Sequence, residues 1–263
     1  MAFIVIIPAR YESSRFPGKP LKMIHGKPMI QWTWMQAKKS GAKRIIIATE
    51  HPEVAQTCEA FGAEVCLTGQ QHNSGTERIA EVIDLAKIQG DEIIVNVQGD
   101  EPMLPSELIH QVAKGLSDHP EISMATLCET IDAVQSVFDP HAVKVSRDLA
   151  NRAINFSRAP LPWSRDTFGE HSKTLPKNWA YKRHIGLYAY RAGFVKQYVA
   201  WPECELEHVE KLEQLRVLWH GEKILVLDAV CEAGVGVDTP EDLERVRLLL
   251  AHVSSAANVD GNH

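Results

Sequence analysis

The feature that most limits the possible folds is a series of short, unbroken apolar runs separated by stretches with helical spacing. In the first half the runs are FIVII (3–7), RIIIA (44–48), EVCL (64–67) and EIIVNV (92–97). The intervening residues 28–39, 52–62 and 75–90 place apolar side chains at helical intervals, and Gly62 and Gly90 are candidate helix ends. Because strands without polar alternation are buried on both faces, the pattern predicts an α/β fold with a doubly wound, mostly parallel sheet.

The second half is less regular. Strands are expected at 122–127, 142–146, 184–191 and 223–229, and amphipathic helices at 205–221 and 239–253. The stretch between Asn155 and Arg183 contains three prolines and few periodic apolar residues, so an excursion from the sheet is expected there. Since no repeat or linker is visible, we predict a single domain over residues 1–253, followed by a disordered tail at 254–263.

Composition excludes several functional classes. The net charge of −6 argues against a general affinity for nucleic acid, because a phosphate backbone requires a basic surface. No run approaches the roughly 20 apolar residues of a membrane-spanning helix, so membrane insertion is not expected. The five cysteines are scattered and never form a CxxC pair, which indicates reduced thiols in the cytoplasm and no zinc site.

A cationic loop follows the first expected strand. It carries Arg10, Arg15 and Lys19, with Gly18 among them. In open α/β sheets the loop after the first strand commonly binds phosphate, and three cations suit a polyphosphate. It is not a Walker A loop, because Pro20 stands where that motif needs a hydroxyl for magnesium. A basic surface loop without a ligand fits these residues equally well.

Two acidic positions are candidates for a metal site. Asp100 and Glu101 follow the strand 92–97, and Asp238 follows a short, glycine-spaced expected strand. Acids beside a polyphosphate would be repelled unless a divalent cation lay between them, so Asp100 and Asp238 predict a Mg²⁺ site. Each acid has a simpler alternative role in capping a turn or the next helix.

The loop HNSGTERIAEV (72–82) runs into an expected helix near Gly75. Free backbone amides at the helix start could contact a nucleobase or a sugar, with Arg78 one turn inside. A capping box formed by Ser74 or Thr76 with Glu77 explains the same spacing, and on spacing alone it is favoured.

Six blocks together resemble the 3-deoxy-manno-octulosonate (Kdo) cytidylyltransferase family, also called CMP-Kdo synthetases. The blocks are RYESSRFPGKPL, HNSGTERIAEV, VNVQGDEP, RHIGLYAYRAGF, LEQLRVLW and GVDTPEDLERVR, and they keep their order from about residue 3 to residue 250. The opening loop is shared with other cytidylyltransferases, so specificity comes from its conjunction with SGTER and RHIGLYAYRAGF. The resemblance implies transfer of CMP from CTP to the anomeric hydroxyl of Kdo, with release of pyrophosphate, for lipopolysaccharide synthesis.

The resemblance also implies a role for individual positions. Those assigned to CTP are Arg10, Arg15, Lys19, Ser74, Gly75, Arg78 and Gln98, the first three on the triphosphate. Those assigned to the acidic eight-carbon sugar are Arg158, His184, Tyr188, Glu210 and Gln214. Asp100 and Asp238 would bind Mg²⁺, and catalysis would rest on Lys19, Arg15 and Asp100.

Further implications concern fold and assembly. The family has a nucleotide-diphospho-sugar transferase-like fold and forms homodimers, so about 130–220 is expected to hold the sugar site and an elaborated dimerisation edge. Tyr11 and Glu12, and residues 165–178, depart from the family pattern.

Alternatives remain open at this point. His184 could be a buried core histidine, and Glu210 with Gln214 could be a simple i,i+4 polar pair. An 8-amino Kdo analogue or a sialic acid could replace Kdo, and a non-catalytic nucleotide sensor is the rival from another class.

Overall fold

The four apolar runs of the first half are neighbouring parallel strands in a computed structural model that describes residues 1–12, 16–72, 74–169 and 174–257. They are β1 (Phe3–Pro8), β4 (Arg44–Thr49), β5 (Glu64–Leu67) and β6 (Ile93–Asn96). β1 lies between β4 and β6, with Val5 opposite both Ile45 and Val95. All residues of β1 and β6 are buried, which explains why these runs contain no polar alternation.

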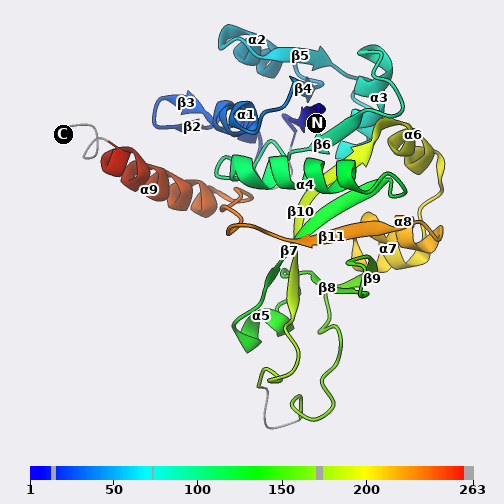
Figure 1. The fold of residues 1–263 in the computed structure, drawn as a ribbon. Helices are drawn as coiled ribbons and strands as arrows, with labels where there is room; N and C mark the ends of the chain where they lie inside the picture. Colours follow the sequence, from blue (N-terminus) through cyan, green and yellow to red (C-terminus); the bar gives the residue numbers. More distant parts are fainter. Residues whose placement is uncertain (13–15, 73, 170–173, 258–263) are drawn as a thin grey trace.

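Helices cover both faces of this sheet (Figure 1), as the sequence predicted. One face packs against α1 (Met29–Lys39), α2 (Pro52–Ala60) and α4 (Ser106–Asp118), and the other against α3 (Gly75–Leu85) and α6 (Ala192–Ala200). The helices α4 and α6 were not anticipated. The expected end of α3 at Gly90 was wrong, because Lys87 adopts a left-handed conformation (φ 55°) two residues after the helix ends.

The sheet is mixed rather than wholly parallel. Its order is β11-β7-β10-β6-β1-β4-β5, with β7 (Met124–Thr130), β10 (Lys182–Arg191) and β11 (Ile224–Asp228) added from the second half. β10 runs antiparallel to both β6 and β7, whereas β11 is parallel to β7. The long strand β10 therefore joins the two halves of the chain into one sheet.

An elaboration extends from one end of β10 and appears at the bottom of Figure 1. It contains α5 (Val134–Phe138), β8 (Lys144–Arg147) and β9 (Ala153–Ser157), followed by a largely irregular segment up to β10. The excursion expected from Asn155 therefore begins later, because residues up to Ser157 pair with β8. A small apolar cluster of its own holds this part together: Ile131, Val137, Phe168 and Tyr181.

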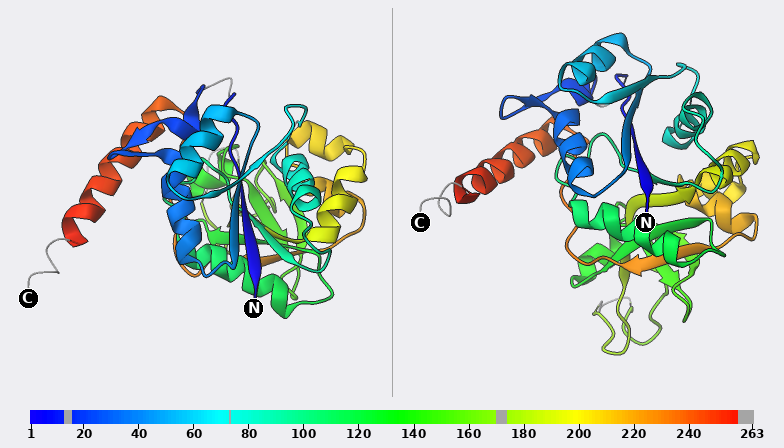
Figure 2. Two further views of the ribbon diagram at one scale, coloured as in Figure 1. Left: turned by 90° about the horizontal axis from the view of Figure 1, so that it is seen from above. Right: turned by 45° about the horizontal axis from the view of Figure 1, so that its top comes forward.

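Short elements link the loop after β1 to α1. They are a 3-10 turn (Lys19–Leu21) and a hairpin of β2 (Met23–Ile24) and β3 (Lys27–Pro28). The carboxyl-terminal helix α9 (Pro240–Ala257) packs its beginning against this hairpin region and projects away from the sheet in both views of Figure 2. The Thr239 hydroxyl accepts a hydrogen bond from Asp242 N (3.2 Å), so Thr239 caps the start of α9.

Three expectations about the carboxyl-terminal half were wrong. Residues 234–237, expected as a strand before Asp238, form none, because Val237 N donates to the Asp100 carbonyl (2.9 Å) in the turn after β6 instead of to a strand. The predicted helix 205–221 is two short helices, α7 (Glu205–Glu210) and α8 (Gln214–Trp219), because Lys211 adopts a left-handed conformation between them. Residues 254–257, expected to be disordered, continue α9, and residues 258–263 lie outside the described residues. In the part of the chain that is described, no helix is both long and apolar enough to cross a membrane.

Candidate active site

A cavity of about 370 Å³ lies between the loop after β1 and the end of β6. Arg10 and Lys19 line it from the loop, Gly75 from the start of α3, and Gln98 and Asp100 from the segment after β6. The loop returns to the cavity because Gly18 takes a left-handed conformation (φ 65°) and its N–H donates to the Tyr11 carbonyl at 3.0 Å. Arg15 lies outside the described residues.

Lys19 brings the cationic loop and the acidic positions together. Its ammonium group lies 2.6 Å from Asp100 Oδ2 and 3.4 Å from Asp238 Oδ1. It also donates to the Val237 carbonyl at 2.9 Å. Two carboxylates from segments far apart in the sequence therefore converge on one positive charge.

The same convergence is suitable for a divalent cation. Glu101 lies beside the pair, and burial together with the charges of Asp100 and Asp238 raises its pKa to about 7. No group of three or more potential ligands is found among the described His, Cys, Asp and Glu residues. Two carboxylates nevertheless suit Mg²⁺, which usually takes one or two of them and completes its shell with phosphates and water.

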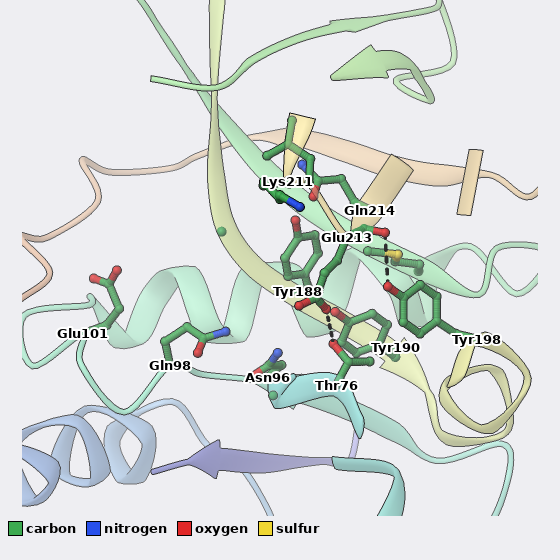
Figure 3. A pocket seen from close by; sticks show the side chains of 14 residues that line it. Thr76, Asn96, Gln98, Glu101, Tyr188, Tyr190, Tyr198, Lys211, Glu213 and Gln214 are labelled. Carbon is green, nitrogen blue, oxygen red and sulfur yellow. Dashed lines mark hydrogen bonds between the residues drawn. The ribbon is translucent and has the colours of Figure 1, made fainter. Parts of the chain in front are cut away.

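A second cavity, of about 300 Å³, adjoins the first and is drawn in Figure 3. Its lining is dominated by polar side chains: Thr76, Asn96, Gln98, Glu101, Tyr188, Tyr190, Tyr198, Lys211, Glu213 and Gln214. Gly75 and Gln98 line both cavities, so a ligand in one would lie next to a ligand in the other.

Hydrogen bonds fix one wall of the second cavity. The Thr76 hydroxyl donates to the Glu213 carboxylate at 3.0 Å, and the Tyr198 hydroxyl donates to the Glu213 carbonyl at 3.2 Å (Figure 3). The Gln214 amide nitrogen is buried and has no partner among the described residues. Such a donor needs a partner, and a polar ligand in the cavity would supply one.

His184 lines a third cavity of about 720 Å³ that shares Gln98 and Glu101 with the second. Its Nε2 lies 3.0 Å from the Thr126 hydroxyl, which also lies 2.8 Å from the Leu187 carbonyl. Because a hydroxyl has one hydrogen to donate, this arrangement is satisfied when Nε2–H donates to Thr126. Burial lowers the pKa of His184 to about 3, so the ring is neutral near pH 7. The ring of Tyr188 lies 5.3 Å away, centroid to centroid.

Arg158 and Glu210 lie apart from the three cavities. The Arg158 guanidinium donates to the carbonyls of Glu210 (2.7 Å) and Pro140 (2.9 Å). The Glu210 carboxylate accepts from the Ser157 hydroxyl (2.7 Å) and from Arg158 N (3.0 Å). These bonds tie β9 to the end of α7. Because the helix breaks at Lys211, it is Glu213 and Gln214 that reach the second cavity.

The beginning of α3 divides its predicted residues between two roles. Ser74 is the helix cap, accepting a hydrogen bond from Glu77 N at 3.2 Å, so the capping alternative is present. Gly75 lines both cavities. Arg78 is 1% exposed, lines none of the three cavities and forms an ion pair with Glu50 at 2.9 Å.

Several cavity residues were not identified in the sequence, chiefly Thr76, Tyr190, Tyr198 and Glu213. Tyr190 and Tyr198 look like core aromatics in apolar surroundings, and only the packing of α6 against the sheet brings Tyr198 to the cavity. Asn96 carried a usable signal, because it is a buried amide at the end of an otherwise apolar strand.

Comparison with known proteins agrees with this geometry. The cytidylyltransferase family model matches residues 4–224. Over 254 residues, the chain is 70% identical to 3-deoxy-manno-octulosonate cytidylyltransferase 1 of Hydrogenovibrio crunogenus, covering 97% of this chain and 98% of that protein. The chain belongs to the 3-deoxy-manno-octulosonate cytidylyltransferase family. A second member, from Pseudomonas syringae pv. tomato, is 57% identical over 249 residues, with 95% and 98% covered.

Solved structures support membership of this cytidylyltransferase family. A CMP:2-keto-3-deoxy-manno-octonic acid synthetase complexed with CTP superposes with a TM-score of 0.86 at 40% identity, covering 95% of this chain and 98% of that one. A 4-diphosphocytidyl-2C-methyl-D-erythritol synthase superposes with a TM-score of 0.62 at 15% identity, which demonstrates a shared fold only.

Proposed function

We propose that this cytidylyltransferase transfers CMP from CTP to the anomeric hydroxyl of Kdo and releases pyrophosphate. The observation that carries the proposal is the pair of adjoining cavities that share Gly75 and Gln98. The first is lined by Arg10 and Lys19 together with Asp100, and the second mainly by polar side chains. A transferase must hold two substrates in contact, and full-length relatives carry the name of this activity.

The first cavity suits the nucleotide. Arg10 and Lys19 supply positive charge, and Gly75 allows the backbone at the start of α3 to approach a ligand closely. In the reaction the sugar oxygen forms a bond to the α-phosphorus, while the bond from that phosphorus to the pyrophosphate oxygen breaks. Lys19 and Arg10 stabilise the negative charge that grows on the leaving pyrophosphate.

The second cavity suits a polyhydroxylated sugar. Tyr188, Glu213 and Gln214 present hydroxyl, carboxylate and amide groups, and the buried Gln214 amide nitrogen would gain its missing acceptor from the sugar. Arg158, assigned to the sugar carboxylate by resemblance, has its guanidinium occupied by backbone carbonyls. We therefore assign recognition of the sugar mainly to the side chains that line the second cavity, and not to Arg158.

Asp100 and Asp238 would hold Mg²⁺, since they already converge on the positive charge of Lys19. A bound Mg²⁺ would orient the α-phosphate and lower the pKa of the attacking hydroxyl. Asp100 lines the first cavity and Asp238 the third. Asp100 is held in place by the turn after β6, where Glu101 N donates to the Gln98 carbonyl at 3.2 Å.

The test is pyrophosphate release from CTP and Mg²⁺ with Kdo, its 8-amino analogue or N-acetylneuraminate as acceptor. We expect release with Kdo, and loss of release in Asp100→Asn, which keeps the shape of the side chain but removes its charge. Pyrophosphate release with the amino analogue alone would identify that analogue, and not Kdo, as the substrate. If the protein binds CTP but releases no pyrophosphate with any of the three acceptors, the transferase proposal is refuted and a nucleotide sensor remains.

Two further properties belong to the proposal. We infer a homodimer, because the elaboration exposes large apolar side chains, including Leu149, Ile154, Trp163 and Trp179. Light scattering would test it, and Trp179→Glu should weaken association if this face is the interface.

We also infer a cytoplasmic location, because all five cysteines are free thiols. Cell fractionation tests that inference.

A further inference from the structure

Arg78 is a buried charge that the proposed mechanism does not use. Its side chain is 2% exposed, yet it carries a positive charge that must be compensated. The compensation comes from Glu50, 2.9 Å away in the residue that follows β4, and from the Thr68 hydroxyl. Thr68 directly follows β5, so Arg78 connects α3 to the ends of two strands.

Glu50 also contacts the cationic loop. Its Oε2 pairs with Arg78, while its Oε1 accepts a hydrogen bond from Tyr11 N at 2.9 Å. That N–H belongs to the peptide joining Arg10 to Tyr11, so Glu50 fixes the backbone that carries Arg10. One carboxylate thus joins two walls of the first cavity, the loop with Arg10 and the helix α3 with Gly75.

The Tyr11 side chain adds a second attachment at the same place. Its ring stacks on that of His51, with centroids 3.8 Å apart and planes 10° apart. The Tyr11 carbonyl accepts the Gly18 N–H at 3.0 Å, one residue before Lys19. The position of Tyr11 therefore affects the positions of both Arg10 and Lys19, which lie at the two ends of the loop.

We propose that Arg78 and Glu50 are positioning residues for the nucleotide: Arg78 acts on CTP through Glu50 and the Arg10–Tyr11 peptide, without touching the nucleotide. The inference rests on the proposed function for its ligand. It replaces the direct contact between Arg78 and cytidine that the resemblance implies. Arg78 lines none of the three cavities, so its effect on a ligand in the first cavity would pass through Glu50 and the loop.

A double-mutant cycle distinguishes the two roles, with the dissociation constant of CTP for the purified protein measured by calorimetry without sugar. Glu50→Gln and Arg78→Met should each raise that constant about tenfold, the effect of one lost charge-assisted contact. If Arg78 acts through Glu50, the double variant should also show about a tenfold rise, because the second change removes nothing more. A direct contact would multiply the effects to about a hundredfold and overturn the proposal.

Matched variants separate positioning from loss of fold. Glu207→Gln and Arg216→Met break another buried ion pair (Arg216 Nη2 to Glu207 Oε1, 2.6 Å), between α7 and α8 and outside the first cavity. They should leave CTP binding unchanged. If they weaken it as much as Glu50→Gln does, the effect is general and the proposal fails.

Tyr11→Ala leaves the buried ion pair between Arg78 and Glu50 intact. It therefore tests the position of the loop even if the variants of Arg78 and Glu50 do not fold. It should weaken CTP binding severalfold while the melting temperature falls little, and Tyr11→Phe, which keeps the stack, should bind as the wild type does. Unchanged binding in Tyr11→Ala would contradict the proposal. Wild-type protein that binds CTP but transfers nothing to Kdo would refute the proposed function alone.

Discussion

Lys19 holds the most consequential position of any single residue in the first cavity. It contacts two carboxylates and a carbonyl, and its ammonium group lies 2.6 Å from Asp100 Oδ2. We expect Lys19→Met to lower kcat/KM for CTP about a hundredfold or more, the usual effect of losing one charge that stabilises the transition state. Pyrophosphate release measures it. Lys27→Met, on the neighbouring hairpin and outside the first cavity, should be neutral, and a comparable loss there would contradict the assignment.

Glu210 and Gln214 provide a paired prediction, because the structure gives them different surroundings. Gln214→Ala removes a cavity donor and should raise KM for the sugar about tenfold without changing stability. Glu210→Ala removes the acceptor for Ser157 and Arg158 N and should lower the free energy of unfolding by about 1–3 kcal/mol. Steady-state kinetics and urea unfolding separate the two. The reverse pattern would place Glu210 in the sugar site.

His184 should make stability depend on pH. Its pKa is about 3 in the folded protein and about 6.5 when unfolded, so below pH 6.5 the unfolded chain binds a proton that the folded protein does not. This contribution to stability is complete above about pH 7 and is lost as the pH falls, by at most about 1.4 kcal/mol per pH unit. Urea unfolding at pH 7.5 and 5.5 should show a smaller difference in His184→Gln than in the wild type. An equal difference would show that His184 is not buried as a neutral ring.

At the scale of elements, the end of α3 illustrates a strained position. Lys87 has φ 55° and an exposed side chain, and its N–H donates to the Asp84 carbonyl at 3.2 Å. Glycine adopts this conformation without steric cost, so Lys87→Gly should stabilise the protein by about 0.5–1 kcal/mol. Lys114→Gly, inside α4, should destabilise it by about 1 kcal/mol, because glycine weakens a helix interior. Thermal unfolding should show a higher melting temperature for Lys87→Gly and a lower one for Lys114→Gly than for the wild type.

Breaks between elements place the cavity residues as much as the elements do. A continuous helix over 205–221 would have kept Glu210 and Gln214 on one face. The left-handed Lys211 turns the chain, so Glu210 stays against β9 while Gln214 enters the second cavity. The register shift in β10 between Ile185 and Tyr188 similarly brings Gly186 to the border of the second and third cavities.

At the scale of the whole molecule, two apolar layers lie on opposite faces of one sheet. Trp34 packs against the first layer and Trp201 against the second, and both layers include residues of β1, β6 and β10. Because the layers share strands, tryptophan fluorescence and far-ultraviolet circular dichroism should report one coincident unfolding transition in urea. Two separated transitions would contradict the single domain predicted for residues 1–253.

The local sequence determined the strands of the first half, the helices between them, and the edge of the sheet where the loop with Lys19 meets Asp100. These follow from residue order alone, because continuous β-branched runs form buried strands and parallel strands present their carboxyl ends at one edge. The tertiary structure alone decided the antiparallel insertion of β10, the burial of Arg78 against Glu50, and the choice of Glu213 over Glu210 at the second cavity. Each of these depends on which distant segment packs against a side chain, and neither periodicity nor spacing along the chain encodes such partners.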